Sequence, residues 1–206
     1  GCKTGTAQVA TKTANAVFVC YAPYDDPQVA LCLVAEGGAS GGNLADGAPA
    51  LFVTGVSATD NRAITDILTV RSGELNNIVV SGVTGVSTEI APYSSLYPRD
   101  LNGDGVTEVP HPEPLPDWEE GGPSYQRVDW KYYNSSGEPA VAFSTYHNTE
   151  DGWYLRLPEE WQDQILVSRV IGLEETSVTF YIRQESPEPF LRITAITGAN
   201  REARAV

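Results

Sequence analysis

The chain has 206 residues, with 27 acidic side chains against 13 basic ones and a formal net charge of −14. Its 41% hydrophobic content can supply a buried core, which excludes an intrinsically disordered chain. Binding to nucleic-acid phosphates needs clustered Lys and Arg, so the acidic balance argues against a nucleic-acid partner. No run of about 18 apolar residues occurs, and the first residues lack the features of a signal peptide. We therefore expect neither a transmembrane segment nor a signal or anchor in this sequence.

A Lys-Thr-Gly triplet stands at residues 3–5 and is followed by Thr6. Two apolar runs follow, at 17–19 and 29–34, and a turn containing Pro23 and Pro27 separates them. Such β-rich runs around a turn predict an antiparallel hairpin, and the triplet strand beside it completes a three-stranded sheet. The Lys ammonium and Thr hydroxyl can hold a substrate carboxylate, and Gly allows close approach of a peptide backbone.

With the triplet strand followed by this hairpin, residues 1–44 resemble the C-terminal end of a penicillin-binding protein transpeptidase domain. The resemblance implies that substrate is bound by Lys3, Thr4, Gly5 and Thr6. The family also needs a Ser-x-x-Lys nucleophile and a Ser-x-Asn motif, and no Ser in this chain satisfies either pattern. Tyr132-Tyr133-Asn134 matches a rarer variant of the second motif but follows the triplet, and we expect it to be a loop. With no complete catalytic set, an enzyme is not the favoured interpretation.

A three-stranded sheet alone buries too little apolar surface to be stable. We therefore expect the sheet in residues 1–48 either to dock on the later β-rich region or to be poorly ordered. The expected contact residues are Val17, Val19, Val29, Leu31 and Leu33. Cys20 and Cys32 lie on the two hairpin strands, where a disulfide is geometrically possible if they oppose each other. Their apolar neighbours favour two buried free thiols instead.

Residues 49–109 contain short β-rich runs at 51–54, 64–70 and 77–80, separated by Gly, Ser and Asp turns. This rhythm is typical of a β-meander or a propeller blade. The region ends in Asp100-Leu101-Asn102-Gly103-Asp104-Gly105-Val106-Thr107-Glu108.

That nine-residue segment has the spacing of a calcium loop. Oxygen side chains at positions 1, 3 and 5, a Gly, a backbone carbonyl and a final acid can surround one Ca²⁺. The predicted ligands are Asp100, Asn102, Asp104, the carbonyl of Val106, and Glu108. An EF-hand would need a Glu where His111 stands, and the prolines from Pro110 onward exclude its second helix. The alternative is an Asx-rich turn, in which the same carboxylates cap backbone amides without an ion.

Residues 110–123 are Pro-rich and acidic, which predicts an extended linker. Residues 124–206 then alternate apolar and polar positions and predict a β-rich C-terminal domain with a short helix over 158–165. The expected strands cover residues 128–133, 140–146, 152–157, 166–170, 177–183 and 190–197. The fold class is therefore mainly β, an α+β chain with few short helices and antiparallel sheets. His111 and His147 belong to no recognisable nucleophile motif, and we expect loop histidines.

Residues 49–206 resemble uncharacterised secreted lipoproteins of gut Firmicutes, through segments at 49–54, 100–110 and 146–154. The acidic loop resembles those of FG-GAP-type propeller repeats. These resemblances imply a bacterial cell-surface, extracytoplasmic location and no known activity. Our hypothesis is a non-catalytic envelope module with a calcium-stabilised loop, whose partner is a peptidoglycan stem peptide or another envelope protein. The alternative is a transpeptidase fragment that contributes the triplet strand to peptidoglycan cross-linking or β-lactam binding.

Overall fold

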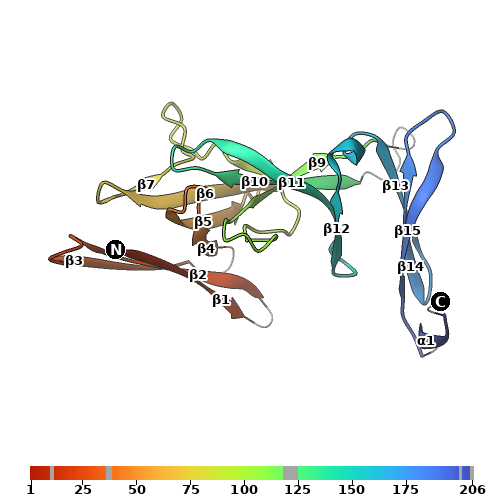
Figure 1. Cartoon of the computed structure of the whole chain (residues 1–206), viewed down its shortest axis with the longest axis horizontal. Coiled ribbons are helices and arrows are strands. Elements are labelled where there is room, and N and C mark those ends of the chain that lie inside the picture. Colours follow the sequence, from red (N-terminus) through yellow and green to blue (C-terminus); the bar gives the residue numbers. More distant parts are fainter. Residues whose placement is uncertain (10–11, 36–38, 118–124, 200, 205–206) are drawn as a thin grey trace. The chain divides into compact units, whose positions relative to one another are not determined.

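The computed structural model describes residues 1–9, 12–35, 39–117, 125–199 and 201–204 (Figure 1). These residues form antiparallel strands and turns with almost no helix, which confirms the mainly β fold class. A propeller blade in the middle region stays a prediction. Two short helices occur in the described residues: η1 (Glu159–Trp161), a single 3-10 turn within the predicted helix, and α1 (Arg201–Arg204).

The chain divides into two compact units. Unit 1 comprises Gly1–Pro112 and Asp129–Ala142, and unit 2 comprises Glu113–Val128 and Phe143–Val206. Strands β9 (Val109–Pro114), β10 (Gln126–Tyr133) and β11 (Pro139–Asn148) contribute residues to both units. The ranges 1–48 and 49–109 therefore lie together in unit 1.

Two antiparallel sheets of the described residues lie wholly in unit 1, while a third, of order β12-β11-β10-β9, has strands that contribute to both units. The first has the order β1-β2-β3, from β1 (Cys2–Val9), β2 (Lys12–Ala22) and β3 (Val29–Ala35), as the hairpin pattern predicts. The second runs β4-β5-β6-β7, with β8 also paired to β6. Its strands are β4 (Ala39–Asn43), β5 (Pro49–Val56), β6 (Arg62–Arg71), β7 (Glu74–Asn77) and β8 (Ile90–Pro92).

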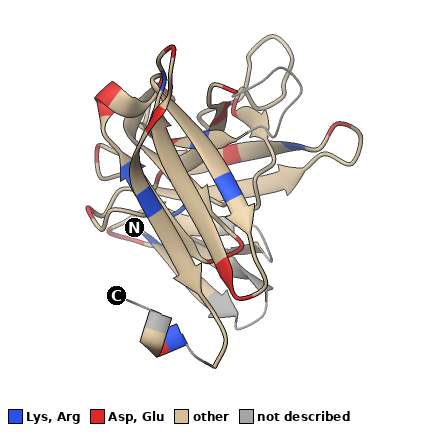
Figure 2. Cartoon of the chain, turned by 90° about the vertical axis from the view of Figure 1, so that its right-hand side faces the viewer, with Lys and Arg blue, Asp and Glu red and all other residues tan. Residues whose placement is uncertain are grey.

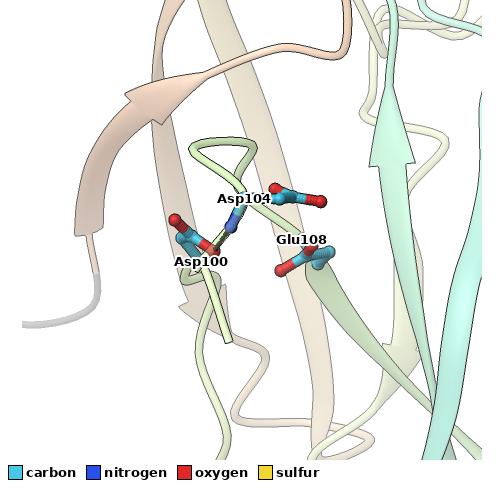
Figure 3. A group of neighbouring side chains, drawn as sticks. All are labelled: Asp100, Asp104 and Glu108. Atoms are coloured by element: carbon cyan, nitrogen blue, oxygen red, sulfur yellow. Dashed lines mark hydrogen bonds between the residues drawn. The ribbon is translucent and has the colours of Figure 1, made fainter. Parts of the chain in front are cut away.

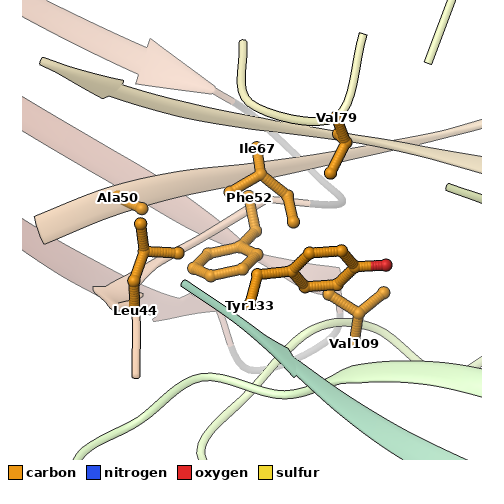
Figure 4. Packing of buried hydrophobic residues seen from close by; sticks show 7 residues of the cluster. All are labelled: Leu44, Ala50, Phe52, Ile67, Val79, Val109 and Tyr133. Carbon is orange, nitrogen blue, oxygen red and sulfur yellow. The ribbon is translucent and has the colours of Figure 1, made fainter. Parts of the chain in front are cut away.

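Strand β5 is covered on both of its faces. Consecutive residues of a strand point to opposite sides, and both Leu51 and Phe52 are at most 1% exposed. On one side Phe52 packs into an apolar cluster that joins β5 and β6 to the ends of β9 and β10 (Figure 4). Its buried members are Leu44, Ala50, Phe52, Ile67, Val79, Val109 and Tyr133. On the other side Leu51 meets the first sheet.

The first sheet docks on the second, as expected, but β2 presents Ala16 and Phe18 to the contact and not the predicted Val17 and Val19. The buried contacts are Ala16 and Phe18 of β2, which pack against Leu51 together with the partly buried Cys20 and Leu33. The predicted residues Val19, Val29 and Leu31 are instead exposed, and Val17 is half-buried outside this cluster, so that prediction holds for Leu33 alone. Both faces of these strands are apolar, so alternation in the sequence could not select the inner one.

The register of the first sheet also separates two of the cysteines. Cys20 pairs with Leu31, whereas Cys32 pairs with Val19, so the two thiols lie on opposite faces of the sheet. Both are free; Cys20 is half-buried and Cys32 is exposed. The prediction of two buried thiols is therefore wrong.

The predicted linker begins as a regular part of the fold. Residues 110–114 belong to β9, and Leu115 is buried in the core of unit 2. Residues 110–117 are therefore not a spacer. The rest of the predicted linker, 118–124, lies outside the described residues.

Unit 2 contains β12 (Trp153–Leu157) and an antiparallel sheet of β13 (Ile165–Ile171), β14 (Glu175–Ile182) and β15 (Glu188–Ile196). Its buried core consists of Leu115, Tyr146, Leu157, Ile165, Val167, Val178 and Phe180. The Tyr146 ring meets Phe180 edge to face at 5.2 Å between centroids, and burial raises the pKa of Tyr146 to about 12. These strands agree with the alternating segments of the sequence.

Many acidic residues lie at turns between strands, as Figure 2 shows in red. Acidic side chains at turns are typical of a solvated surface. Within the described residues, none of the helices has the length and apolar composition needed to cross a bilayer.

Candidate metal centre

The acidic loop at 100–108 is closed at its base by a pair of backbone hydrogen bonds. The amide of Arg99 donates to the carbonyl of Glu108 at 3.0 Å, and the amide of Glu108 donates back at 3.1 Å. The Arg99 guanidinium lies 5.5 Å from the centroid of the Trp130 ring, a cation–π contact that supports this base. The two ends of the loop are therefore held together at its base.

Strand β4 anchors the second half of the loop. The Thr107 amide donates to the Asn43 carbonyl at 2.9 Å, and the Asn43 side-chain amide donates to the Gly105 carbonyl at 3.1 Å. Gly42 lies so close that a Cβ atom there would be 1.7 Å from the Thr107 hydroxyl. A side chain at position 42 would displace Thr107, the residue before Glu108, so Gly42 is required for this packing.

Inside the loop, backbone amides preorganise the carboxylates. Asp100 accepts hydrogen bonds from the amides of Gly103 at 2.7 Å, Asp104 at 3.2 Å and Gly105 at 2.9 Å. Gly103 and Gly105 have φ values of 80° and 89°, a left-handed conformation that Gly adopts without strain. The Asx-turn pattern of the alternative interpretation is therefore present. It leaves an acceptor site for a cation on Asp100 Oδ2, which accepts from one amide, whereas the two acceptor sites of Oδ1 are taken by the amides of Gly103 and Asp104.

Three carboxylates converge across the loop. Asp100, Asp104 and Glu108 each offer an oxygen, and these oxygens all lie within 4.8 Å of one another (Figure 3). Asp100 and Asp104 are exposed, whereas Glu108 is buried. Three negative groups this close repel one another unless a cation or protons neutralise them.

Glu108 is the unusual member of the group. The residue is 0% exposed; its Oε2 accepts a hydrogen bond from the Leu101 amide at 3.1 Å, while its Oε1 is buried without a hydrogen-bond partner in the described structure. Burial raises the pKa of Glu108, and the neighbouring charges of Asp104 and Asp100 raise it further. A buried, incompletely satisfied carboxylate is costly, and a bound cation would supply the missing partner.

The donor set suits a hard divalent cation. Carboxylate and carbonyl oxygens without Cys or His are the ligands of Ca²⁺, which accepts six to eight of them in flexible geometry. The predicted ligand Asn102 lies beside the group: its Nδ2 donates to Asp104 Oδ2 at 2.8 Å, and its Oδ1 accepts from the Asp104 amide at 2.9 Å. The Val106 amide donates to Asp104 Oδ1 at 2.8 Å, which places Val106 at the turn beside the same carboxylate.

The Lys-Thr-Gly strand occupies a different part of unit 1. The Lys3 ammonium donates to the carbonyl of Thr4, and the Thr6 hydroxyl lies 3.3 Å from both the amide nitrogen and the carbonyl oxygen of Gly41. A Cβ at Gly41 would lie 2.9 Å from the backbone of Gly5, so β4 runs directly against the triplet. Of the four predicted substrate-binding residues, Thr6 is engaged by β4, while Lys3 and Gly5 are exposed and Thr4 is half-buried.

A buried polar network was not predicted from the sequence. Glu89 accepts a hydrogen bond from the Tyr133 hydroxyl, and its Oε1 lies 3.0 Å from Nδ1 of His111. Burial opposes the charge on Glu89, but these two hydrogen bonds and the charge of Lys131 outweigh it and lower the pKa of Glu89. Tyr133 ends the predicted strand at 128–133, whereas His111 lies in β9 and not in the loop expected for it. No sequence signal joins them to Glu89, because each comes from a different segment.

In unit 2, the neighbours of His147 have structural partners. Arg169 pairs with Glu150 at 2.5 Å, and the Asn148 side chain donates to Asp151 at 2.7 Å. The His147 ring stacks on Tyr154 with centroids 5.1 Å apart. His147 itself lies in β11, whereas the sequence predicts a loop histidine.

Comparison with protein-family models, with curated proteins and with solved structures found no match. A function must therefore be inferred from the chemistry of the acidic loop.

Proposed function

We propose that this chain is a non-catalytic, extracytoplasmic module of the bacterial cell envelope whose loop at 100–108 binds one Ca²⁺. The observation that carries the proposal is the buried Glu108, whose unpartnered Oε1 belongs to the same cluster as Asp100 and Asp104. The preorganised turn supports it, because the loop need not be built when the ion arrives.

The role of the ion follows from the position of its ligands. Glu108 immediately precedes Val109, which is 1% exposed in the core cluster of unit 1. Asp100 immediately follows Arg99, which closes the base of the loop. An ion shared by Asp100 and Glu108 would cross-link the two ends of the loop and hold β9 in place. We propose a stabilising role for Ca²⁺ and none in catalysis.

The affinity expected of such a loop agrees with an extracytoplasmic location. Calcium sites of extracellular modules have dissociation constants of about 10⁻⁴ to 10⁻³ M, because calcium outside cells is abundant. Only three carboxylates are contributed here, and two of them are exposed. A site of this kind would be filled outside a cell and largely empty in a cytoplasm.

The first sheet is proposed as a structural support, with the exposed part of β1 as an edge where a peptidoglycan stem peptide or an envelope partner could pair. The contact of Thr6 with Gly41 favours this over the transpeptidase-fragment alternative. Loss of the nucleophile alone removes on the order of a millionfold of rate in serine enzymes. Covalent labelling of the chain by a fluorescent β-lactam would instead favour the transpeptidase-fragment alternative.

Thermal melting of the intact chain with and without calcium tests the proposed function. We expect Ca²⁺ to raise the midpoint, because a ligand that binds the folded state alone adds about 2.7 kcal/mol when its free concentration is a hundredfold above the dissociation constant. Mg²⁺ at the same concentration should act more weakly, since it demands stricter octahedral geometry. With a dissociation constant of about 10⁻⁴ to 10⁻³ M, this hundredfold excess corresponds to about 10 to 100 mM calcium, and an unchanged midpoint over that range would contradict calcium binding.

A further inference from the structure

The cysteines of β1 and β2 face each other directly. Cys2 and Cys20 are register partners in the antiparallel pair, with Lys3 opposite Val19 as the next pair. Residues directly opposite each other in a sheet carry their side chains on the same face. The two thiols, both free in this structure, therefore lie side by side.

The hydrogen-bond pattern identifies the kind of pair. Gly1 and Tyr21 exchange both of their backbone hydrogen bonds, from the Gly1 nitrogen to the Tyr21 carbonyl at 3.0 Å and from the Tyr21 amide to the Gly1 carbonyl at 2.9 Å. Since the two pair types alternate along an antiparallel ladder, Cys2 and Cys20 form a non-hydrogen-bonded pair, with Cα atoms about 4.5 Å apart. Disulfides span Cα separations of about 4.4 to 6.8 Å, so the backbone already has a suitable spacing.

The surroundings leave both sulfur atoms within reach of a small reagent. The two residues line a cavity of about 510 Å³ between the first sheet and the β6–β7 hairpin. Other lining residues include Tyr21, Tyr24, Val70 and Leu75. Cys2 is exposed and Cys20 is half-buried. Cys32 lies on the other face of the sheet and cannot compete for Cys20 without a change of register.

We propose that Cys2 and Cys20 are a redox pair that forms a cross-strand disulfide. The oxidant is a small disulfide such as oxidised glutathione. The exposed Cys2 thiolate attacks it, forms a mixed disulfide and releases one glutathione; Cys20 then attacks the Cys2 sulfur and releases the second. Two protein thiols lose two electrons and two protons, and these appear as two glutathione thiols.

The Cys2–Cys20 disulfide would restrain strand β1. It ties β1 to β2 at Cys2, the residue immediately before the Lys-Thr-Gly triplet, and closes the segment 3–19 into a loop. The contacts of β1 with the second sheet, including Thr6 with Gly41, then no longer depend on strand pairing alone. This pair goes beyond the calcium proposal and does not rest on it.

The test is thiol–disulfide exchange on the intact, fully reduced chain. After treatment with oxidised glutathione, we expect Cys2 and Cys20 to lose their thiols and to retain no glutathione, and non-reducing peptide mapping to give a Cys2–Cys20 link; the exposed Cys32, which has no thiol beside it, is free to carry a mixed disulfide. The Cys32→Ser variant should form the same link, lose both of its thiols and retain no glutathione. Cys2→Ser should form no intramolecular disulfide, and its exposed position makes it a mild substitution.

Three results would overturn the proposal: a stable mixed disulfide with glutathione on Cys2 or Cys20, a Cys20–Cys32 link, or a disulfide-bonded dimer of a folded chain. Hydrogen exchange gives a second readout. In the oxidised wild type, the amides of β1 should exchange more slowly than in the reduced protein, and Cys2→Ser should show no such difference.

Discussion

The Glu108→Gln variant is expected to be more stable than the wild type in chelator and less stable in calcium. Without the ion, the wild type carries a buried carboxylate beside Asp100 and Asp104, and glutamine removes that charge while its carbonyl can still accept from the Leu101 amide. With the ion, the wild type gains the ligand-linked stability and the variant loses most of it. Thermal melts of both proteins in chelator and in about 10 to 100 mM calcium measure this reversal.

The stability difference between Glu108→Gln and the wild type should depend on pH. The pKa of Glu108 is raised in the folded state, so the folded protein binds a proton there more tightly than the unfolded chain does. In chelator, the destabilisation by Glu108 is absent below the unfolded value near 4.5 and grows as the pH rises through the folded value. The stability difference between Glu108→Gln and the wild type should therefore be largest at neutral pH and shrink toward acid.

Glu74→Gln is the matched control, because Glu74 is an exposed acid on β7, away from the loop. It removes the same formal charge and should leave the response to calcium unchanged. A Glu108→Gln variant that still responded to calcium like the wild type would show that the ion binds elsewhere. One that was strongly destabilised in chelator would contradict the description of Glu108 as a costly buried charge.

The Tyr133→Phe variant is expected to lose about 2 kcal/mol of stability at neutral pH, since hydrogen bonds to charged groups contribute roughly 1.5 to 3 kcal/mol. The Tyr133 hydroxyl donates to the Glu89 carboxylate, and Tyr133 is 2% exposed in the core cluster. Phenylalanine keeps the ring in that cluster but removes this donor from the buried Glu89 carboxylate, which keeps its contact with His111 at 3.0 Å. Chemical denaturation of the two proteins measures the loss.

Tyr132→Phe serves as the control, because Tyr132 is a half-buried residue on the other face of β10. The pKa of Glu89 is lowered by folding, so its contribution is complete above the unfolded value near 4.5 and is lost as the pH falls through the lower folded value. The cost of Tyr133→Phe should therefore decrease in acid. Equal effects of the two substitutions at every pH would mean that the Glu89 network adds nothing to stability.

The strands could be predicted from the sequence because alternation and turn residues are local signals. The segments at 128–133 and 177–183, for example, became β10 and β14. The inner face of the first sheet could not be predicted in the same way. Phe18 and Val19 are both apolar, and only the position of Leu51 beneath the sheet decides that Phe18 is buried. That contact depends on packing between residues distant in the sequence.

The candidate metal centre could likewise be predicted from the sequence only in part. Spacing alone indicated Asp100, Asp104 and Glu108, because a nine-residue loop brings its own ligands together. The burial of Glu108 could not be read from that spacing; it results from Thr107 and Val109, which are fixed by Gly42 and by the core of unit 1. Glu89, His111 and Tyr133 lie in three segments, so their network appears only in the folded chain.

The most direct measurement of the central claim is the number of calcium ions bound per chain at equilibrium, by dialysis against radioactive calcium. One ion per wild-type chain is expected at saturation, with binding strongly weakened in Glu108→Gln and unchanged in Glu74→Gln. Failure of the folded wild-type chain to retain calcium at millimolar concentration would contradict the account, as would equal binding by Glu108→Gln.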